Sequence, residues 1–252
     1  MRKKKRVVII GGAGVIGTII IPPLSSKYEI IILDIDERLP KEIYEFRKVD
    51  ISNYKELIKN IPGNTDVLIN LAALPVKLTL VSDDEFRSMV NVYVIGSYNV
   101  FLAASQLKIK KVVFASSNHV TGYYEKKGKS ISGKKITTLD YPLVDNVYGA
   151  MKLFAEQSGR LFSEKHKISV ICLRIATVVE DEINFLLFND RSRRTILSHK
   201  DTVNIFAAAI DTKIKYGVYY AVSDNPENPW DIQKTMDELG NFTEKNSSQI
   251  LN

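Results

Sequence analysis

The chain has 252 residues, a hydrophobic fraction of 45% and a formal net charge of +6. This length fits one large α/β domain or one domain with a small appendage, and the hydrophobic content is sufficient for a sizeable core. No apolar run approaches the roughly 18 residues that span a bilayer, so we expect no membrane segment. A single cysteine, Cys172, excludes an internal disulfide and fits a reducing cytoplasm, and one cysteine with three histidines gives no zinc pattern.

The start of the chain is strongly basic. Arg2 to Arg6 contains only Arg and Lys, and such a run can bind phosphates of nucleic acid or form a solvated leader. We favour the solvated leader, because no nucleic-acid-binding motif accompanies it and no signal-peptide cleavage region follows.

A glycine-rich loop follows the first expected strand. The apolar run from Val7 to Ile10 is typical of a buried parallel strand, and three glycines, Gly11, Gly14 and Gly17, then recur at three-residue spacing. Such a loop lets the backbone turn sharply and approach a pyrophosphate, which the free N–H groups of the next helix then face. An ordinary strand-to-helix turn has the same appearance, so the motif needs support from its context.

The second expected strand supplies that support. Glu29 to Asp34 is another buried run, and it ends in a carboxylate roughly 20 residues beyond the loop. Asp34 is therefore placed to accept hydrogen bonds from the hydroxyls of an adenosine ribose. Because a carboxylate repels a 2′-phosphate, Asp34 favours NAD over NADP.

Strands and helices alternate through the first two thirds of the chain, which predicts a parallel sheet with helices on both faces. Pro22-Pro23 should leave the first helix short, kinked or ended near Ile21, because proline inside a helix costs about 3 kcal/mol or more. We expect a third strand within Glu42 to Asp50. Ser52 is the expected N-cap of a helix to Ile61 that Pro62-Gly63 ends. A fourth strand covers Val67 to Ala73, whose small last residues allow a cofactor to approach, and Asp50-Ile51 are placed to line its adenine pocket.

Three further segments complete this part of the chain. Asp83 to Leu107 is expected to form one long helix that contains Asn91. A fifth strand, Lys111 to Ser116, leads into Ser117-Asn118-His119 at the sheet edge where open α/β proteins bind ligands. Tyr123 to Asp145 reads as a long, mobile, partly basic loop, which is either a lid or binding loop or a solvated excursion.

A tyrosine and a lysine share one face of the next helix, expected from Val147 to about His166. Tyr148 and Lys152 are four residues apart, so their side chains are neighbours. An ammonium stabilises a phenolate and lowers the tyrosine pKa from about 10 toward neutrality. With the Ser117 hydroxyl, the pair supplies a base, its activator and a hydrogen-bond partner for the oxidation of an alcohol.

The sequence resembles the short-chain dehydrogenase/reductase superfamily of the extended, epimerase-like type. The resemblance implies a Rossmann-type α/β fold with a doubly wound parallel sheet and a short C-terminal substrate-binding part. It implies an NAD-binding part in residues 1–170, with residues 171–252 interleaved in the same domain. Ser117, Tyr148 and Lys152 correspond to the catalytic residues. The implied cofactor-binding residues are Gly11, Gly14, Val15, Ile16, Gly17, Asp34, Asp50, Ile51, Leu71, Ala72, Ala73, Asn91, Tyr148 and Lys152.

Within that superfamily, the chain is most similar to the uronate dehydrogenases, which oxidise C1 of glucuronate or galacturonate to a lactone with NAD. The related archaeal sugar-phosphate dehydrogenases share the short form. This similarity implies that the sugar is held by Ser117, Asn118, His119, Thr177 and Arg191, although His119 also fits a loop-packing role. The segments that carry it are Phe114 to His119, Gly122 to Tyr124, Leu173 to Ile175, Leu197 to His199 and Trp230-Asp231.

The chain departs from this pattern at several positions. Pro75 stands where a substrate-binding serine is usual, and Ala176-Thr177 replaces a Gly-Ser pair. The segment from Val178 to Asp190 is longer and more apolar than expected. Arg191 to Arg194 adds cations beyond one substrate-binding arginine. These departures concern the substrate more than the chemistry.

We therefore expect a cytoplasmic NAD-dependent sugar dehydrogenase, most similar in its residues to one that acts on a hexuronic acid. The alternatives are a sugar-phosphate or aldose dehydrogenase, a nucleotide-sugar epimerase or dehydratase, and a redox-sensing or RNA-associated binding protein that uses the fold without catalysis. No metal, nucleic-acid or membrane partner is expected. The resemblance implies a homodimer or higher oligomer, assembled through the helices at Asp83–Leu107 and Val147–His166.

Overall fold

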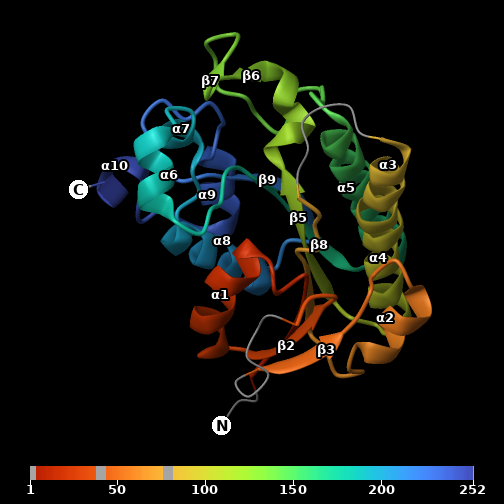
Figure 1. Ribbon diagram of the computed structural model, residues 1–252. Coiled ribbons are helices and arrows are strands. Elements are labelled where there is room, and N and C mark those ends of the chain that lie inside the picture. Colours follow the sequence, from red (N-terminus) through yellow and green to blue (C-terminus); the bar gives the residue numbers. More distant parts are fainter. Residues whose placement is uncertain (1–3, 38–43, 76–81, 252) are drawn as a thin grey trace.

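A computed structural model describes residues 4–37, 44–75 and 82–251. Its centre is a seven-stranded parallel sheet in the order β3-β2-β1-β4-β5-β8-β9 (Figure 1). The strand order reverses between β1 and β4, which creates the crevice where doubly wound sheets bind ligands. The expected α/β fold is therefore confirmed. The strands are β1 (Arg6–Ile10), β2 (Glu29–Asp34), β3 (Glu45–Lys48), β4 (Val67–Asn70), β5 (Lys111–Ser117), β8 (Ser169–Ile175) and β9 (Tyr216–Ala221).

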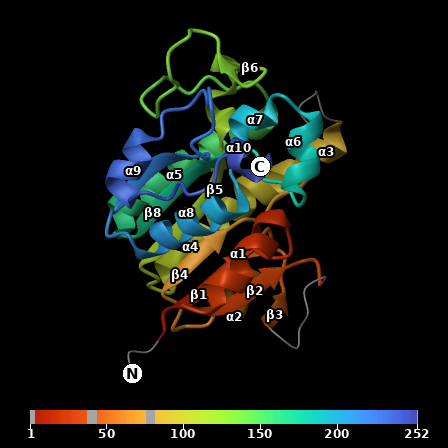
Figure 2. The same ribbon diagram turned by 90° about the vertical axis from the view of Figure 1, so that its left-hand side faces the viewer.

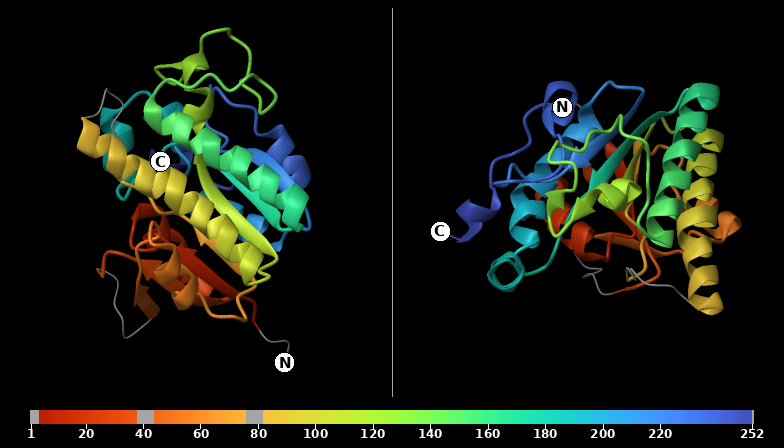
Figure 3. Two further views of the ribbon diagram at one scale, coloured as in Figure 1. Left: turned by 90° about the vertical axis from the view of Figure 1, so that its right-hand side faces the viewer. Right: turned by 90° about the horizontal axis from the view of Figure 1, so that it is seen from above.

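Helices cover both faces of the sheet, as the alternating pattern predicts. One face carries α1, α8 and α9, and the other carries α2, α4 and α5 (Figures 1 and 3). Residues of β1 alternate between two cores: Val7 and Ile9 pack with α1 and α8, whereas Val8 and Ile10 pack with α4 and α5. The helices are α1 (Val15–Ser25), α2 (Tyr54–Asn60), α3 (Asp83–Met89), α4 (Ser97–Gln106), α5 (Val147–His166), α6 (Glu182–Phe188), α7 (Ser192–Thr195), α8 (His199–Asp211), α9 (Gln233–Leu239) and α10 (Ser247–Leu251).

The first helix does not end near Ile21. It continues through Pro22 and Pro23, and the hydroxyls of Ser25 and Ser26 donate to the carbonyls of these prolines, each at 2.7 Å. Both proline rings lie on the exposed side of α1, whose opposite side packs against α8. Tertiary packing of that buried side therefore outweighs the helix-breaking tendency of the prolines.

The expected long helix from Asp83 is continuous but not uniform. Between α3 and α4 it contains a π-helical segment, η1 (Val90–Gly96), and it ends at Gln106. A Cβ at Gly96 would lie 2.4 Å from Cδ1 of Ile51, so a glycine is needed where this segment meets the end of β3. Segments of this kind frequently occur at functional sites.

Other boundaries differ in detail from the expectation. The N-cap of α2 is Asn53, because the Ser52 hydroxyl donates instead to the Asp50 carboxylate at 2.8 Å. Strand β4 ends at Asn70 and β5 extends to Ser117. The third strand was expected within residues that include Glu42, which lies outside the described residues, as do the first two residues of the basic leader.

The segment from Tyr123 to Asp145 is not a featureless loop. Its first two residues end a 3₁₀ segment, η2 (Asn118–Tyr124), and a two-stranded hairpin of β6 (Glu125–Lys126) and β7 (Lys129–Ser130) follows. This hairpin lies at the top of the molecule near α7 (Figure 2). Within the described residues, no helix is long and apolar enough to cross a membrane.

Candidate active site

The glycine-rich loop is shaped for a close backbone approach. Gly11 has φ +76°, and a Cβ there would lie 2.4 Å from the backbone nitrogen of Ala72; at Gly17 it would lie 2.1 Å from the carbonyl oxygen of Gly12. Gly14 is the N-cap of α1, and among the described residues no side chain caps this helix end. The amides of Val15 and Ile16 at that end are therefore available to an anion such as a pyrophosphate.

Asp34 lies beside this loop, as its distance along the chain predicts. Its Oδ2 accepts from the backbone N–H of Ala13 at 2.8 Å, and its Oδ1 accepts from that of Asp36 at 3.0 Å. Asp34 is half-buried, and these two bonds hold its carboxylate against the loop. This is the place that a ribose-binding acid requires.

The ends of β3 and β4 complete this side of the crevice. Ile51 is buried and Asp50 is exposed, and the N–H of Leu71 continues the sheet by donating to the carbonyl of Ile10 at 2.8 Å. Ala72 and Ala73 follow with their small side chains. Asn91 lies apart from them: it is exposed at the start of η1 and lines a hollow of 350 Å³ with residues of α3.

Ser117, Tyr148 and Lys152 form a buried group, with exposed fractions of 4%, 9% and 3%. Ser117 ends β5, and the other two lie on the first turns of α5. This helix begins close to the strand end because Gly149 packs on His119: a Cβ at Gly149 would lie 2.5 Å from the His119 carbonyl oxygen. The Asn146 side chain caps the helix by accepting from the N–H of Gly149 at 2.8 Å.

The charge state of this group differs from the expectation. Burial raises the pKa of Tyr148 well above its usual range, the nearby Tyr93 raises it further, and the Ser117 hydroxyl lowers it. Burial also lowers the pKa of Lys152 to about 7, against the opposing effect of Glu156. Without a bound cofactor, Lys152 therefore does not lower the pKa of Tyr148. Its ammonium donates to the Ala115 carbonyl at 2.6 Å, and burial disfavours its charged form.

Tyr93 is a site residue that the sequence analysis did not select. Its ring packs edge-on to that of Tyr148 with centroids 5.1 Å apart, and Lys152 Nζ lies 5.1 Å from its centroid. Its hydroxyl also donates to the carbonyl of Leu74 at 3.0 Å and accepts from the N–H of that residue at 2.9 Å. Tyr93 thereby joins η1 to the end of β4, a role that its place in a helical pattern does not reveal.

A second unpredicted feature is a buried ion pair behind the lysine. Glu156, 1% exposed, lies one turn beyond Lys152 on α5 and accepts from Arg174 through both carboxylate oxygens, each at 2.9 Å. It also accepts from the hydroxyl of Ser116 at 2.5 Å. The ion pair connects α5 to the ends of β5 and β8. In the sequence, the four-residue spacing between Lys152 and Glu156 indicates that Glu156 lies on the same helix face.

The expected sugar-binding residues lie at the same sheet edge. Asn118 is 4% exposed, and His119 follows it with Nδ1 3.0 Å from both carboxylate oxygens of Asp145. The rings of His119 and Tyr148 have centroids 6.0 Å apart. Thr177 lies two residues beyond the end of β8, where Ile175 pairs with Ser117, and its hydroxyl is 3.0 Å from that of Thr195.

Arg191 contacts this group but is already paired. Its Nη1 donates to the Thr177 hydroxyl at 3.4 Å, whereas its Nε and Nη2 donate to the Glu125 carboxylate, the latter at 2.6 Å. Glu125 was not identified from the sequence, because it lies 66 residues away in the hairpin. No group of three or more His, Cys, Asp or Glu side chains in the described part of the chain is arranged to hold a metal ion.

A sequence profile of the NAD dependent epimerase/dehydratase family matches residues 7–191. The chain therefore belongs to this family, and its cofactor is NAD, which the glycine loop and Asp34 fit.

The chain is 48% identical over 248 residues to the uncharacterized protein YtbQ of Bacillus subtilis, covering 98% of this chain and 97% of that one. It is 25% identical over 256 residues to the NAD-dependent glucose-6-phosphate dehydrogenase of Haloferax volcanii, covering 97% and 95% of the two chains. The crystal structure of a glucuronic acid dehydrogenase from Chromohalobacter salexigens is similar with a TM-score of 0.82 and 26% identity, covering 96% of this chain and 85% of that one.

Proposed function

We propose that this protein oxidises the anomeric carbon, C1, of an anionic sugar with NAD. The observation that carries the proposal is the buried group of Ser117, Tyr148 and Lys152 at the carboxyl end of β5, at the same sheet edge as the glycine loop. The similarity to dehydrogenases of sugars and sugar acids supports the same reaction class.

Bound NAD supplies the hydride acceptor. The residues that would hold it are Gly11, Gly14, Val15, Ile16 and Gly17 at the pyrophosphate, Asp34, Asp50 and Ile51 at the adenosine, and Leu71, Ala72 and Ala73 along the crevice. Asn91 lies apart from them at the start of η1, and its contact with the cofactor stays a prediction. The ammonium of Lys152 would bind the nicotinamide ribose.

In this mechanism the C1 hydroxyl lies between Ser117 and Tyr148. The phenolate of Tyr148 takes the hydroxyl proton as the hydride leaves C1, so that the carbon is oxidised to a carbonyl and both electrons pass to the acceptor. The Ser117 hydroxyl donates to the reacting oxygen and orients it.

Burial disfavours a phenolate at Tyr148 and an ammonium at Lys152 when each is charged alone. When both are charged together, each stabilises the other, and Lys152 Nζ lies 5.5 Å from the Tyr148 ring centroid. Transfer of the tyrosine proton toward the lysine would then prepare the base.

The first candidate substrate is a hexuronic acid, glucuronate or galacturonate, oxidised to its aldarolactone. Asn118, His119 and Thr177 would bind its hydroxyls, and Arg191 its carboxylate. Asn118 is buried and the His119 ring lies beside Tyr148, which supports hydrogen bonding of the sugar by these side chains.

The second candidate substrate is a sugar phosphate. A neutral aldose is a further alternative. The pairing of Arg191 with Glu125 favours this candidate, because the fork that would clamp a substrate carboxylate is taken by an internal one. A nucleotide-sugar epimerase or dehydratase would keep its cofactor bound and produce no net NADH.

The experiment is a panel of uronic acids, aldoses and sugar phosphates, with NADH formation as the readout. We expect stoichiometric NADH from one anionic class. Cofactor that co-purifies, resists dialysis and gives no net NADH would contradict the proposal in favour of an epimerase. Salt-dependent binding to nucleic acid without turnover of any sugar would favour a non-catalytic binding protein.

We also propose that the enzyme works in the cytoplasm as a homodimer, joined through α3, η1, α4 and α5. Apolar side chains are exposed on these helices, including Ile95, Tyr98, Phe154 and Leu161 at 41 to 49%. Sedimentation of the wild type should give twice the chain mass, and a monomer at micromolar concentration would contradict this assembly.

A further inference from the structure

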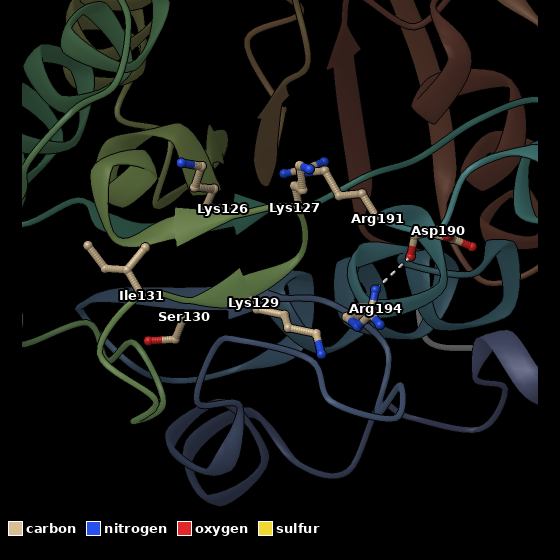
Figure 4. A pocket seen from close by; sticks show the side chains of 8 residues that line it. All are labelled: Lys126, Lys127, Lys129, Ser130, Ile131, Asp190, Arg191 and Arg194. Carbon is tan, nitrogen blue, oxygen red and sulfur yellow. Dashed lines mark hydrogen bonds between the residues drawn. The ribbon is translucent and has the colours of Figure 1, made fainter.

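A hollow of 590 Å³ lies between the β6–β7 hairpin and the loop that leads into α7 (Figure 4). We call it the basic pocket. Five cationic side chains line it, with one carboxylate and two other residues. The lining residues are Lys126, Lys127, Lys129, Ser130, Ile131, Asp190, Arg191 and Arg194.

The positive charge of the basic pocket is only partly balanced. Arg191 pairs with Glu125, and a single carboxylate, Glu227, serves both Arg194 and Lys129 at 2.8 and 3.3 Å. With Asp190, three carboxylates face five cations, which leaves an excess of two positive charges. Among the described residues, neither Lys126 nor Lys127 has a carboxylate partner.

The hairpin holds these charges together at an energetic cost. Lys126 and Lys129 are directly opposite in the antiparallel register, where like charges destabilise a strand pair. Lys127 and Gly128, with φ of 53° and 79°, form a two-residue turn that keeps the third lysine beside them. A bound dianion would relieve this repulsion.

The hairpin is also fixed to α7 in the absence of any ligand. Glu125, 7% exposed in its side chain, accepts from both the N–H of Gly128 and Arg191. A Cβ at Gly128 would lie 3.1 Å from the Arg191 carbonyl oxygen, so the turn packs directly on this segment. The pocket is therefore a built feature and not a chance meeting of two loops.

The basic pocket adjoins the candidate sugar site. Arg191 is one of the residues that line the pocket, and its Nη1 donates to the hydroxyl of Thr177 at 3.4 Å. The chain from Ser117 also leads through η2 directly into the hairpin. A sugar with its C1 at Tyr148 and its distal group near Arg191 would join the two sites.

We propose that the basic pocket binds a phosphate monoester carried by the substrate, which makes the substrate a sugar phosphate. A phosphate monoester has a charge of about −1.5 to −2 at neutral pH and three acceptor oxygens, which suits several separate ammonium groups. A carboxylate would need the bidentate fork of Arg191, which Glu125 occupies. The proposal rests on C1 oxidation as the function and selects the second of its two candidates.

The test compares three sugars that differ at C6 alone: glucose, glucose 6-phosphate and glucuronate. We expect the wild type to prefer the phosphate in kcat/KM. The double variant Lys126→Gln/Lys127→Gln should lower the ratio of kcat/KM for glucose 6-phosphate over glucose by about 10- to 100-fold. Lys134→Gln, an exposed lysine outside the pocket, is the matched control and should leave that ratio unchanged.

Inorganic phosphate provides a readout that does not depend on turnover. It should raise the Tm of the wild type and of Lys134→Gln, but not that of the double variant, and it should compete with glucose 6-phosphate. If phosphate binds while no sugar is oxidised, the proposed function fails and the anion site stands. If phosphate binds but glucuronate is the preferred substrate, the pocket holds free phosphate and the substrate assignment is overturned. If phosphate neither binds nor competes, the pocket is not a phosphate site.

Discussion

The two sides of the candidate site are built differently. On the reaction side, Ser117, Tyr148, Lys152 and Glu156 are all less than 10% exposed, and each is fixed by a helix turn, a strand end or a buried partner. On the substrate side, the basic pocket is formed by a hairpin and a short loop, with side-chain exposures of 58% for Lys129, 34% for Arg191 and 25% for Arg194. The reaction side is therefore buried and held by internal partners, whereas the substrate side is formed by segments at the surface.

This difference leads to different consequences of mutation. Changes on the reaction side should abolish turnover or destabilise the fold whatever the sugar. Changes on the substrate side should alter the choice of sugar and leave the fold intact, since exposed ion pairs contribute little to stability.

Tyr148→Phe should produce the largest effect. It removes the proposed proton acceptor and keeps the ring that packs on Tyr93, so kcat should fall by about 10²- to 10⁴-fold while NAD still binds. Stopped turnover with unchanged NAD titration and unchanged Tm is the expected result. Activity retained within about tenfold would mean that another group is the base.

Glu156→Gln should reduce stability by about 3–5 kcal/mol, because it leaves the buried Arg174 without a charged partner. Urea denaturation measures the change. The matched control is Glu164→Gln on the same helix, where an exposed pair with Arg160 should contribute about 0.5 kcal/mol or less. An equal loss of unfolding free energy in the two variants would show that the buried ion pair stabilises the fold no more than the exposed one.

Lys152→Met should change how the stability of the protein depends on pH, because it removes a buried ammonium. Lysine titrates near 10.5 when unfolded and at about 7 in the fold, so between these values the unfolded chain binds more protons and wild-type stability rises with pH. The difference in unfolding free energy, wild type minus variant, should increase by about 2 kcal/mol from pH 7 to pH 9 without added NAD. A flat difference would contradict the low pKa. Lys111→Met, which replaces another buried lysine, should keep its turnover, whereas Lys152→Met should not.

Arg191→Lys should act on the substrate side. A lysine cannot keep two parallel bonds to Glu125, so the junction between Thr177 and the basic pocket should loosen. We expect kcat/KM for the anionic sugar to fall by about 10- to 100-fold, chiefly through KM, with a much smaller change for a neutral aldose. Equal losses on neutral and anionic sugars would assign Arg191 a purely structural role.

Asp34 should determine the choice of cofactor. Asp34→Asn keeps an acceptor for the N–H of Ala13 but removes the charge that repels a 2′-phosphate. The preference for NAD over NADP should weaken by about tenfold, the equivalent of 1.4 kcal/mol, whereas kcat with NAD should change little. A wild type that uses both cofactors equally would contradict the role given to this carboxylate.

The sequence predicted the reaction side more completely than the substrate side. The position of Asp34 follows from strand and loop lengths, and the shared face of Tyr148 and Lys152 follows from helix geometry. Glu125 and Arg191, by contrast, meet only through tertiary packing, and no periodic sequence pattern indicates such a contact. The π-helical segment and Tyr93 were missed for the same reason.

Energetic balances were harder to predict than positions. Pro22 and Pro23 do not end α1, because packing on α8 outweighs a local penalty. The tyrosine pKa rises, although an ammonium is near, because both groups are buried and the ammonium has another partner. In each case the contacts that decide the outcome come from distant parts of the chain.

The most direct test of the account follows the hydrogen on C1. The wild type is supplied with NAD and with its preferred sugar carrying deuterium at C1, and the NADH and the sugar product are analysed by mass spectrometry. The account predicts one deuterium in NADH for each lactone formed and none in the product. NADH without deuterium, or a sugar product that retains it with no net NADH, would contradict oxidation at C1.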